Sequence, residues 1–176
     1  MNNIDILGDY LPLQSSDPLI RQDSARLFDM WQNWATQDAQ AELPRWSNFN
    51  PMKFTSILSN VVLVQVDDND AENAQLKLVG ERAGMYLPGV DNSPISTITS
   101  QENLAHVKLC LKACLQHRLP CYTVKSMAWR SARQRVYDCL MMPFYHDDKT
   151  TKVLSLLHFN IQDSELVPKK MRTVSE

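Results

Sequence analysis

The chain has 176 residues, of which 44% are hydrophobic and 22% are charged, and its formal net charge is −2. These values fit one folded domain with an appendage and a buried core of its own. The near-neutral charge gives no reason to expect nucleic acid as the main partner. The longest apolar stretch, residues 54–66, is too short and too polar to insert into a membrane.

The N-terminus lacks a basic start followed by an apolar run, so we expect no signal peptide and a cytoplasmic location. Cysteines in a reducing compartment stay thiols. We therefore expect no structural disulfide among the four cysteines, which are Cys110, Cys114, Cys121 and Cys139.

The first predicted element is an amphipathic helix in the N-terminal segment, residues 1–43. Ser16 or Asp17 can cap its start, and Pro18 suits the first helical position. Apolar side chains then recur at three- and four-residue steps and form one stripe: Ile20, Leu27, Phe28, Trp31, Trp34 and Ala35. So wide a stripe needs a partner surface, which is either the protein's own sheet or the helix of a second copy. Four of its members are the candidate interface residues: Leu27, Phe28, Trp31 and Trp34.

A second, short helix is predicted after Asn50 and Pro51, which provide an acceptable cap followed by Pro in the first turn. Residues 61–66 (VVLVQV) are almost continuously apolar and β-branched, as in a central strand, and residues 76–79 predict another strand. Gly and Pro recur through residues 81–100, so we expect only short helical turns and loops there.

A longer helix follows these loops. Thr99 and Glu102 have the spacing of a capping box, and Pro120 lies just past the predicted end. The apolar face of this helix consists of Leu104, Val107, Leu111, Cys114 and Leu115.

Three short strands are predicted after the long helix, at residues 121–129, 136–144 and 153–159. The polar turns between them are short, which favours a three-stranded antiparallel meander. Both faces of these strands are apolar over much of their length, so something must cover each face. The element order predicts an α+β fold: a five-stranded antiparallel sheet with a helical crossover on one face and an extra N-terminal amphipathic helix.

Three stretches carry a resemblance to a known family: LPRWSNFNPMKFTSILSNVVLVQV, LKLVGERAG and YDCLMMPF. With them the chain, from about residue 43 to about residue 159, resembles the short, largely single-domain PAS proteins common in alphaproteobacteria. One departure is clear, because Gly80 is followed by Glu81 where the family often has Thr. The resemblance implies a PAS-like domain over residues 44–162, and a basic, flexible tail follows over residues 163–176.

The PAS arrangement also implies an apolar pocket enclosed by the sheet, the long helix and the loops of residues 81–100. Such a space with a few polar groups is the usual description of a small-molecule site. The candidates to line it and bind a ligand are Met85, Tyr86, Leu111, Tyr122, Val124 and Leu157. The alternative is an interior that is simply filled by side chains.

The long helix also carries the candidate haem or metal ligands, namely His106, Cys110, Cys114 and His117. PAS proteins that bind haem often use a His of this helix. His106 and His117 are about 16 Å apart along the helix, so they cannot share one ion. Each adjacent pair offers two ligands, whereas a structural zinc ion needs four. The more ordinary interpretation is that Cys114 is a small core residue and both histidines lie at the edge of the helix. The cofactor, if any, stays unknown.

No nucleophile motif is present. His158 on the last strand lies near Cys139 in the expected meander, but we find neither an aligned base nor an orienting group. We therefore expect no catalytic activity.

We expect a non-catalytic sensory or regulatory module that shifts between conformations when a ligand or a partner favours one state. The partner is a second copy of the chain or a signalling protein, and the ligand is a small apolar molecule. Two alternatives stay open. One is a haem- or metal-binding PAS sensor, and the other is a pure interaction or dimerisation domain with a filled core.

Overall fold

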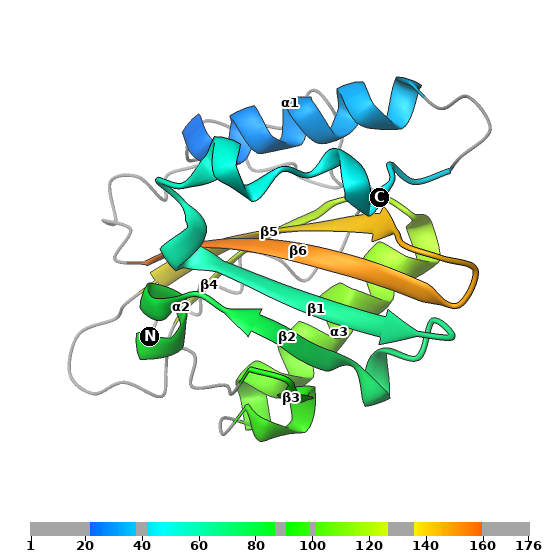
Figure 1. Ribbon diagram of the computed structural model, residues 1–176. Helices are drawn as coiled ribbons and strands as arrows, with labels where there is room; N and C mark the ends of the chain where they lie inside the picture. Colours follow the sequence, from blue (N-terminus) through cyan, green and yellow to red (C-terminus); the bar gives the residue numbers. More distant parts are fainter. Residues whose placement is uncertain (1–21, 38–41, 87–90, 99–100, 127–135, 160–176) are drawn as a thin grey trace, which may run out of the picture.

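The structure is a computed structural model that describes residues 22–37, 42–86, 91–98, 101–126 and 136–159. These residues form one antiparallel sheet with helical segments on both faces (Figure 1). This is the expected α+β arrangement.

The sheet has six strands in the order β3-β2-β1-β6-β5-β4. Every neighbouring pair is antiparallel, and β4, β5 and β6 form the expected meander. The sixth strand, absent from the expected five, is β3, a two-residue edge strand that contains a proline and therefore has no readable pattern. The strands are β1 (Val61–Asp67), β2 (Gln75–Val79), β3 (Ser93–Pro94), β4 (Cys121–Ser126), β5 (Val136–Tyr145) and β6 (Thr150–Phe159).

The helical segments follow the predicted order. The expected short helix is the 3-10 helix η2, and Asn50 caps it, because its Oδ1 accepts a hydrogen bond from the Met52 N–H at 3.0 Å. No helix in the described ranges is long and apolar enough to cross a bilayer. The α-helices are α1 (Gln22–Gln37), α2 (Glu81–Tyr86) and α3 (Gln101–His117), and the other 3-10 helices are η1 (Trp46–Asn48), η3 (Leu58–Asn60), η4 (Ala71–Asn73) and η5 (Ile95–Thr97), with η2 at Pro51–Phe54.

Some expectations fall outside the described residues. These are the start of the first helix at Ser16 to Pro18, the cap at Thr99, the end of the strand predicted at 121–129, and the tail 163–176.

The sheet separates two hydrophobic cores, and β5 contributes to both. Cys139 and Met141 lie in the core between the sheet and α3, which we call the inner core. Leu140 and Met142 lie in the core between the sheet and α1, which we call the outer core. Side chains alternate along a strand, so a strand that is apolar at every position must be covered on both sides. The expectation that each face is covered is therefore met within one chain.

Helix α1 covers the outer face of its own sheet (Figure 1). Trp31 is 4% exposed, and its Nε1–H donates a hydrogen bond to the Pro143 carbonyl of β5 at 2.8 Å. Leu27 and Phe28 are buried in the same core, and Trp34 is half-buried against it. Of the two alternatives for the helix, the structure shows packing on its own sheet. Leu27, Phe28 and Trp31 present no surface to a second molecule while α1 stays in place, so the interface role of these four residues stays a prediction.

A close backbone contact holds α2 beside η3. The Gly80 N–H donates to the Val61 carbonyl at 2.7 Å. A Cβ atom on Gly80 would lie 2.5 Å from the carbonyl oxygens of Leu58 and Ser59, a distance that real Cβ atoms do not reach. Glycine is therefore required where the chain leaves β2 and begins α2.

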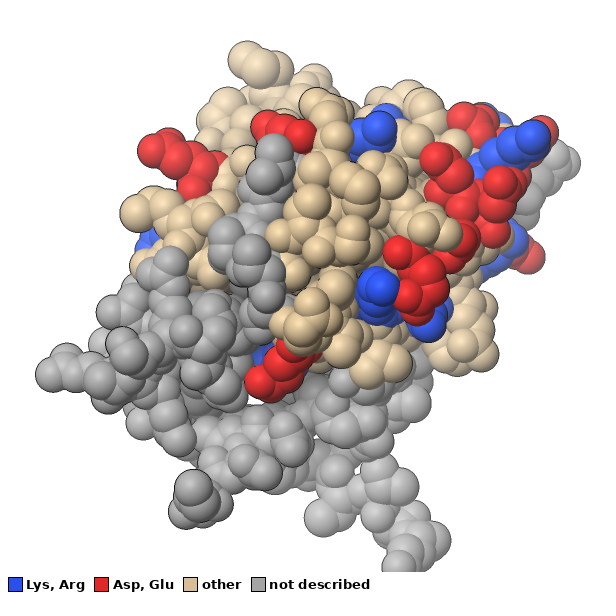
Figure 2. Space-filling view, turned by 90° about the horizontal axis from the view of Figure 1, so that it is seen from below, with Lys and Arg blue, Asp and Glu red and all other residues tan. Residues whose placement is uncertain are grey.

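Charged side chains of both signs are mixed on the surface seen in Figure 2. Glu72 accepts from Lys108 and Lys112 of α3 at 2.6 and 2.7 Å. The hydrogen bond from Lys108 is the main cause that lowers the pKa of Glu72 to about 2. The described part of this face shows no extended basic area of the kind that binds a phosphate backbone.

We predict that Trp31→Phe destabilises the protein by about 2 kcal/mol, because it removes a buried hydrogen bond and leaves the Pro143 carbonyl without its donor. Trp34→Phe is the matched control, since Trp34 is half-buried and its ring contact with Phe144 can be kept by another aromatic ring. It should cost less than about 1 kcal/mol. Urea unfolding followed by circular dichroism measures both. Equal losses in the two variants would contradict the packing of α1 described here.

We also predict that Gly80→Ala destabilises the protein by at least about 2 kcal/mol, because the added methyl group collides with rigid backbone. Gly84→Ala on α2 is the control. Its Cβ would meet only a Val79 methyl group at 3.5 Å, and alanine favours a helix by about 0.5–1 kcal/mol. Thermal unfolding should move in opposite directions for the two variants, and a neutral Gly80→Ala would show that α2 is not held against η3.

Candidate functional site

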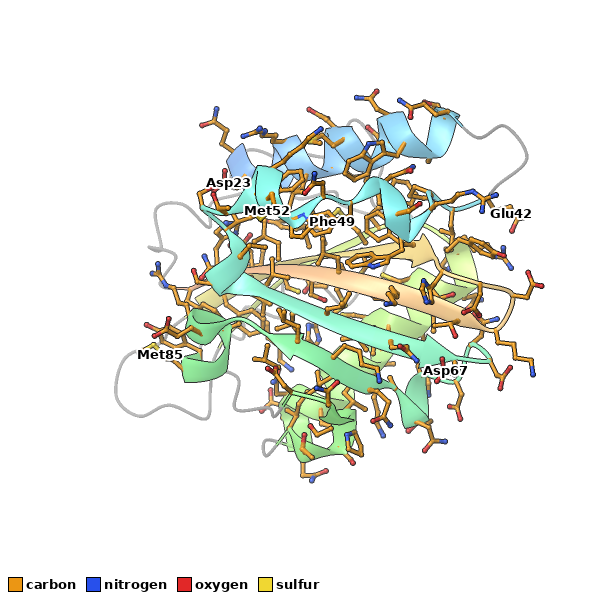
Figure 3. The ribbon with its side chains drawn as sticks, viewed as in Figure 1. Asp23, Glu42, Phe49, Met52, Asp67 and Met85 are labelled. Carbon is orange, nitrogen blue, oxygen red and sulfur yellow. The ribbon has the colours of Figure 1, made fainter. Side chains whose placement is uncertain are left out.

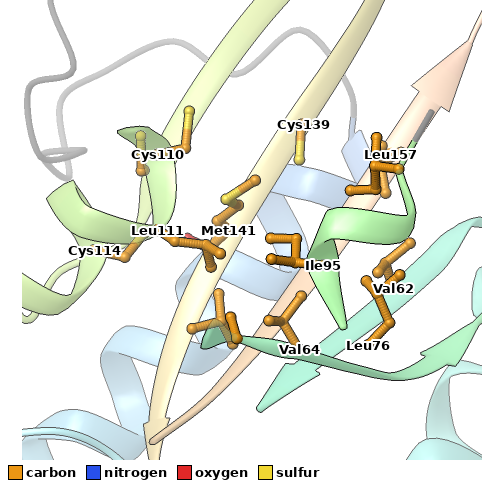
Figure 4. Close-up of a cluster of buried hydrophobic side chains, with 14 of the residues drawn as sticks. Val62, Val64, Leu76, Ile95, Cys110, Leu111, Cys114, Cys139, Met141 and Leu157 are labelled. Atoms are coloured by element: carbon orange, nitrogen blue, oxygen red, sulfur yellow. Dashed lines mark hydrogen bonds between the residues drawn. The ribbon is translucent and has the colours of Figure 1, made fainter. Parts of the chain in front are cut away.

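A cavity of about 40 Å³ lies in the inner core, between the sheet and α3. Figure 4 shows how side chains from several strands point toward one another in this core. The cavity is lined mainly by apolar groups, with a few polar ones among them: Val62, Val64, Leu76, Val79, Ile98, His106, Val107, Thr123, Tyr137, Cys139, Met141, Ser155 and Leu157.

Small side chains at neighbouring positions of the meander explain why space remains here. Thr123 of β4 pairs with Cys139 of β5, and Met141 of β5 pairs with Ser155 of β6. Three of these four side chains are smaller than the leucine, isoleucine and valine side chains around them. A strand position with a short side chain leaves a gap unless a neighbour fills it, because folded cores are otherwise packed like crystals.

Two hydroxyl groups in this cavity have no strong hydrogen-bond partner. Thr123 Oγ1 and Ser155 Oγ are buried, and neither bonds to an oxygen or nitrogen atom of the described chain. The Thr123 hydroxyl lies beside the Cys110 thiol, which is a weak hydrogen-bond group. A buried polar group that loses water without gaining a partner costs about 1–3 kcal/mol. The cavity therefore contains hydrogen-bonding capacity that the protein itself does not use.

His106 of α3 adds a neutral imidazole to the cavity wall. The residue is 8% exposed, and its Nε2 lies 3.6 Å from the Cys110 sulfur. Burial first, and the positive charge of Lys125 second, lower the pKa of His106 to about 4. At neutral pH the ring is uncharged, so it can donate one hydrogen bond and accept another.

The opposite wall is fixed by a bond between β5 and α3. The Tyr137 hydroxyl donates to Asn103 Oδ1 at 3.0 Å, and both residues are buried. Tyr137 thereby ties the strand that lines the cavity to the helix that closes it.

The four cysteines are free, buried thiols, as expected. Burial raises the pKa of Cys114 and of Cys139, and the Cys114 thiol donates weakly to the Met141 carbonyl at 3.8 Å. Interaction with the Cys110 thiol first, and with the Cys114 thiol second, lowers the pKa of Cys121. Three thiols therefore lie close together beside the cavity.

The candidate haem and metal ligands do not come together as a centre. His106 and Cys110 are buried neighbours and Cys114 packs in the core, but His117 is exposed at the end of α3. Within the described ranges no three His, Cys, Asp or Glu side chains are grouped to hold a metal ion. A cavity of about 40 Å³ is also far below the volume of a porphyrin, since a benzene ring alone occupies a cavity of about 150 Å³. The residues present therefore do not fit haem.

The structure places the predicted ligand-binding residues at different positions around the inner core. Leu157 lines the cavity, and Leu111 lies in the same core without reaching the cavity. Met85 is 63% exposed and sits at the outer end of α2 (Figure 3). Tyr86 stacks on Phe159, with ring centroids 4.3 Å apart. Tyr122 and Val124 lie on the outer face, because they alternate with Thr123, which faces inward.

Of the residues that line the cavity, sequence reasoning named only Leu157 as ligand-binding, and it missed Thr123 and Ser155 among the others. A signal for these two exists, because each is a short polar residue inside an otherwise apolar strand. Such a residue on a two-sided apolar sheet either packs as a small group or faces a cavity.

Asp138 supplies the orienting group that the sequence did not reveal for His158. Its Oδ2 accepts from His158 Nδ1 at 3.3 Å, and the pair lies on the outer face of the sheet. Cys139 points to the inner core instead, so it does not pair with His158.

We predict that protein stability falls as the pH drops from about 6.5 to about 4. The unfolded chain binds a proton on His106 near pH 6.5, whereas the folded protein resists it down to about pH 4, so the unfolded state binds more protons in that window. At pH 5 this difference is worth about 2 kcal/mol. Urea unfolding at pH 7 and pH 5 measures the change in the free energy of unfolding between the two pH values. His106→Gln should lose the part of this change that comes from His106, and the control His117→Gln should keep it. Identical pH slopes in the two variants would contradict the burial of a neutral His106.

The comparisons with known proteins agree with this architecture. A model of the PAS domain family matches residues 21–158 of the chain. The match begins within the N-terminal segment and includes α1, the residues that line the core cavity and all of the sheet except Phe159, the last residue of β6. A search of curated proteins found no match. Because the family model covers more than half of the sequence, the chain belongs to the PAS domain family.

Proposed function

We propose that this PAS domain is a non-catalytic sensory module in which a small, mostly apolar ligand with one hydrogen-bonding group binds in the core cavity and shifts the conformation of the domain. PAS domains in general serve sensing and regulation, and they often mediate protein interactions and dimerisation. The observation that supports a ligand is that the buried residues Thr123 and Ser155 line an apolar cavity and that neither hydroxyl bonds to an oxygen or nitrogen atom of the described chain.

The cavity volume sets the size of the ligand. About 40 Å³ accommodates about three or four water-sized groups, by the requirement of about 10–15 Å³ for each. A ligand of a few non-hydrogen atoms fits the cavity as it stands. A larger ligand must push α3 away from the sheet or move side chains of the wall. Such a ligand binds the widened state better than the closed state, and that difference in affinity is what shifts a conformational equilibrium.

Strand β5 supplies a direct route from the cavity to the outer face. Cys139 and Met141 line the cavity, whereas the neighbouring Leu140 and Met142 contact the outer core under α1. The Pro143 carbonyl of the same strand holds Trp31. A displacement of β5 therefore changes the surface on which α1 rests, because packed side chains transmit a shift rather than absorb it.

We infer that the signal leaves through α1, toward a second copy of the chain or a signalling protein. The outer sheet face itself is covered by α1, so the helix is the element of this side that a partner can reach. A tilt of α1 would expose parts of Leu27 and Phe28, which then become available to a partner.

One alternative is favoured by a specific observation. The small cavity volume also fits a pure interaction domain whose inner core is nearly filled. In that case Thr123 and Ser155 are merely tolerated polar groups, and no ligand accompanies the protein.

We predict that the double variant Thr123→Val with Ser155→Ala removes ligand binding without harming the fold. Loss of two unpartnered hydroxyls should leave the ligand-free protein as stable as before, or more stable by about 1–3 kcal/mol. Native mass spectrometry of the protein as purified should show an added small mass on the wild type and none on the variant, with denaturing spectra giving the chain mass alone. The control, Thr55→Val with Ser96→Ala, changes exposed residues of the same kinds and should retain the added mass.

Two results together would contradict the ligand proposal. The wild type would carry no added mass, and no small molecule in a screen would raise its melting temperature more than that of the double variant. The filled-core alternative would then hold.

A further inference from the structure

A second, larger pocket lies outside the core cavity, at the end of the sheet where β6 finishes. It has a volume of about 420 Å³. In Figure 1 the start of α1 lies above this end of the sheet and α2 lies below it. The described residues that line the pocket come from four segments and are mostly polar: Gln22, Asp23, Asn60, Arg82, His158 and Phe159.

A buried carboxylate holds His158 in this pocket. Asp138 is 0% exposed, and its Oδ2 accepts from His158 Nδ1 at 3.3 Å and from the Tyr122 hydroxyl at 3.2 Å. The His158 side chain is 13% exposed. Since Nδ1 is engaged with Asp138, the Nε2 atom on the other side of the ring is the one available to the pocket, and the bond to the carboxylate keeps Nδ1 protonated. In the tautomer that carries its proton on Nδ1, the Nε2 atom is the hydrogen-bond acceptor of the ring.

The pocket also contains hydrogen-bond acceptors and a cationic donor without a partner among the described residues. Asn60 Oδ1 is buried without a hydrogen-bond donor. Asp23 at the start of α1 and Arg82 on α2 form no ion pair with any residue that the structure describes. One wall therefore offers acceptors, from Asp23, Asn60 and His158, and α2 on the far side of the sheet end offers the guanidinium donors of Arg82.

We propose that this pocket binds a small dipolar molecule of the free amino-acid class. The ammonium group of the ligand donates to Asp23, Asn60 Oδ1 and His158 Nε2, and its carboxylate accepts from Arg82. Phe159 provides an apolar wall for the ligand side chain. A guanidinium group suits a carboxylate because it can donate two parallel hydrogen bonds.

The charges of the pocket argue for a dipolar ligand over a simple ion. A plain carboxylic acid would satisfy Arg82 but would face the carboxylate of Asp23 and two further acceptors. A plain amine would satisfy those acceptors but would leave Arg82 beside a second cation. Only a molecule with both groups satisfies both walls at once. This proposal is independent of the core cavity, because the two sites share no lining residue.

Isothermal titration calorimetry on the full chain tests the proposal, with glycine, L-serine and L-glutamine as separate probes and with acetate and methylammonium as single-charge probes. At least one amino acid should bind at least about tenfold more tightly than either single-charge probe. Arg82→Gln and Asp23→Asn should each weaken that binding by about tenfold or more, as expected for the loss of a charged hydrogen bond. Arg26→Gln and Asp29→Asn are matched controls on the exposed side of α1 and should leave the affinity unchanged.

Three outcomes would overturn the proposal. The first is the absence of heat with every amino acid probe. The second is equal binding of acetate or methylammonium, which would reduce the site to a simple ion site. The third is binding that survives Arg82→Gln and Asp23→Asn but disappears in the variant with Thr123→Val and Ser155→Ala, because the ligand would then occupy the core cavity. Circular dichroism of each variant shows whether it is folded, and the two exposed substitutions are not expected to affect folding.

Discussion

The structure depends on a sheet that is buried on both faces. Strands β5 and β6 carry apolar side chains at successive positions, and period-two alternation sends these side chains into two separate cores. Neither core can form without its covering helix, since an apolar face left in water forfeits roughly 25 cal/mol for each Å² that stays exposed. Helices α1 and α3 are thus coupled through the sheet between them. The covering of the outer face by α1 also avoids an exposed hydrophobic patch of the kind that drives aggregation.

The core cavity is a local exception to this dense packing. Thr123, Cys139 and Ser155 lie together on neighbouring strands, and their short side chains leave space in the inner core. Two unpartnered hydroxyls and an apolar gap are each unfavourable for a structure selected for stability alone. Their coincidence at one place is what a binding site would require, because a site must leave groups unsatisfied until the ligand arrives. A valine and an alanine at these positions would remove both costs.

The end of the sheet uses different chemistry. Asp138 is fully buried on the outer face of the sheet, and it accepts hydrogen bonds from the Tyr122 hydroxyl and the His158 imidazole. His158 in turn lines the polar pocket. A buried carboxylate needs such partners, since its transfer from water is otherwise very costly. The glycine contact at Gly80 sets the position of α2 and hence of Arg82, so a backbone constraint in the sheet edge shapes this second pocket. The core cavity therefore has a mainly apolar lining, whereas the pocket at the end of the sheet has a polar lining with charged groups.

The sequence by itself determined the order of the elements, the meander and the two-sided apolar sheet, because these follow from periodicities of 2 and 3.6 and from caps such as Asn50 that act within a few residues. The resemblance to PAS proteins came from longer stretches such as YDCLMMPF. It did not determine which side of a strand faces which core. Tyr122 and Val124 were expected to line the cavity, and Thr123 between them does so, because a shift of one residue reverses the face of every side chain. Nor could it bring Asp138 to His158, since their contact depends on the antiparallel register of β5 with β6. Helices, strands and caps depend on residues that are close together in the sequence. Strand registers and pockets depend on residues that are far apart in the sequence, and only the packed tertiary structure determines which of these meet.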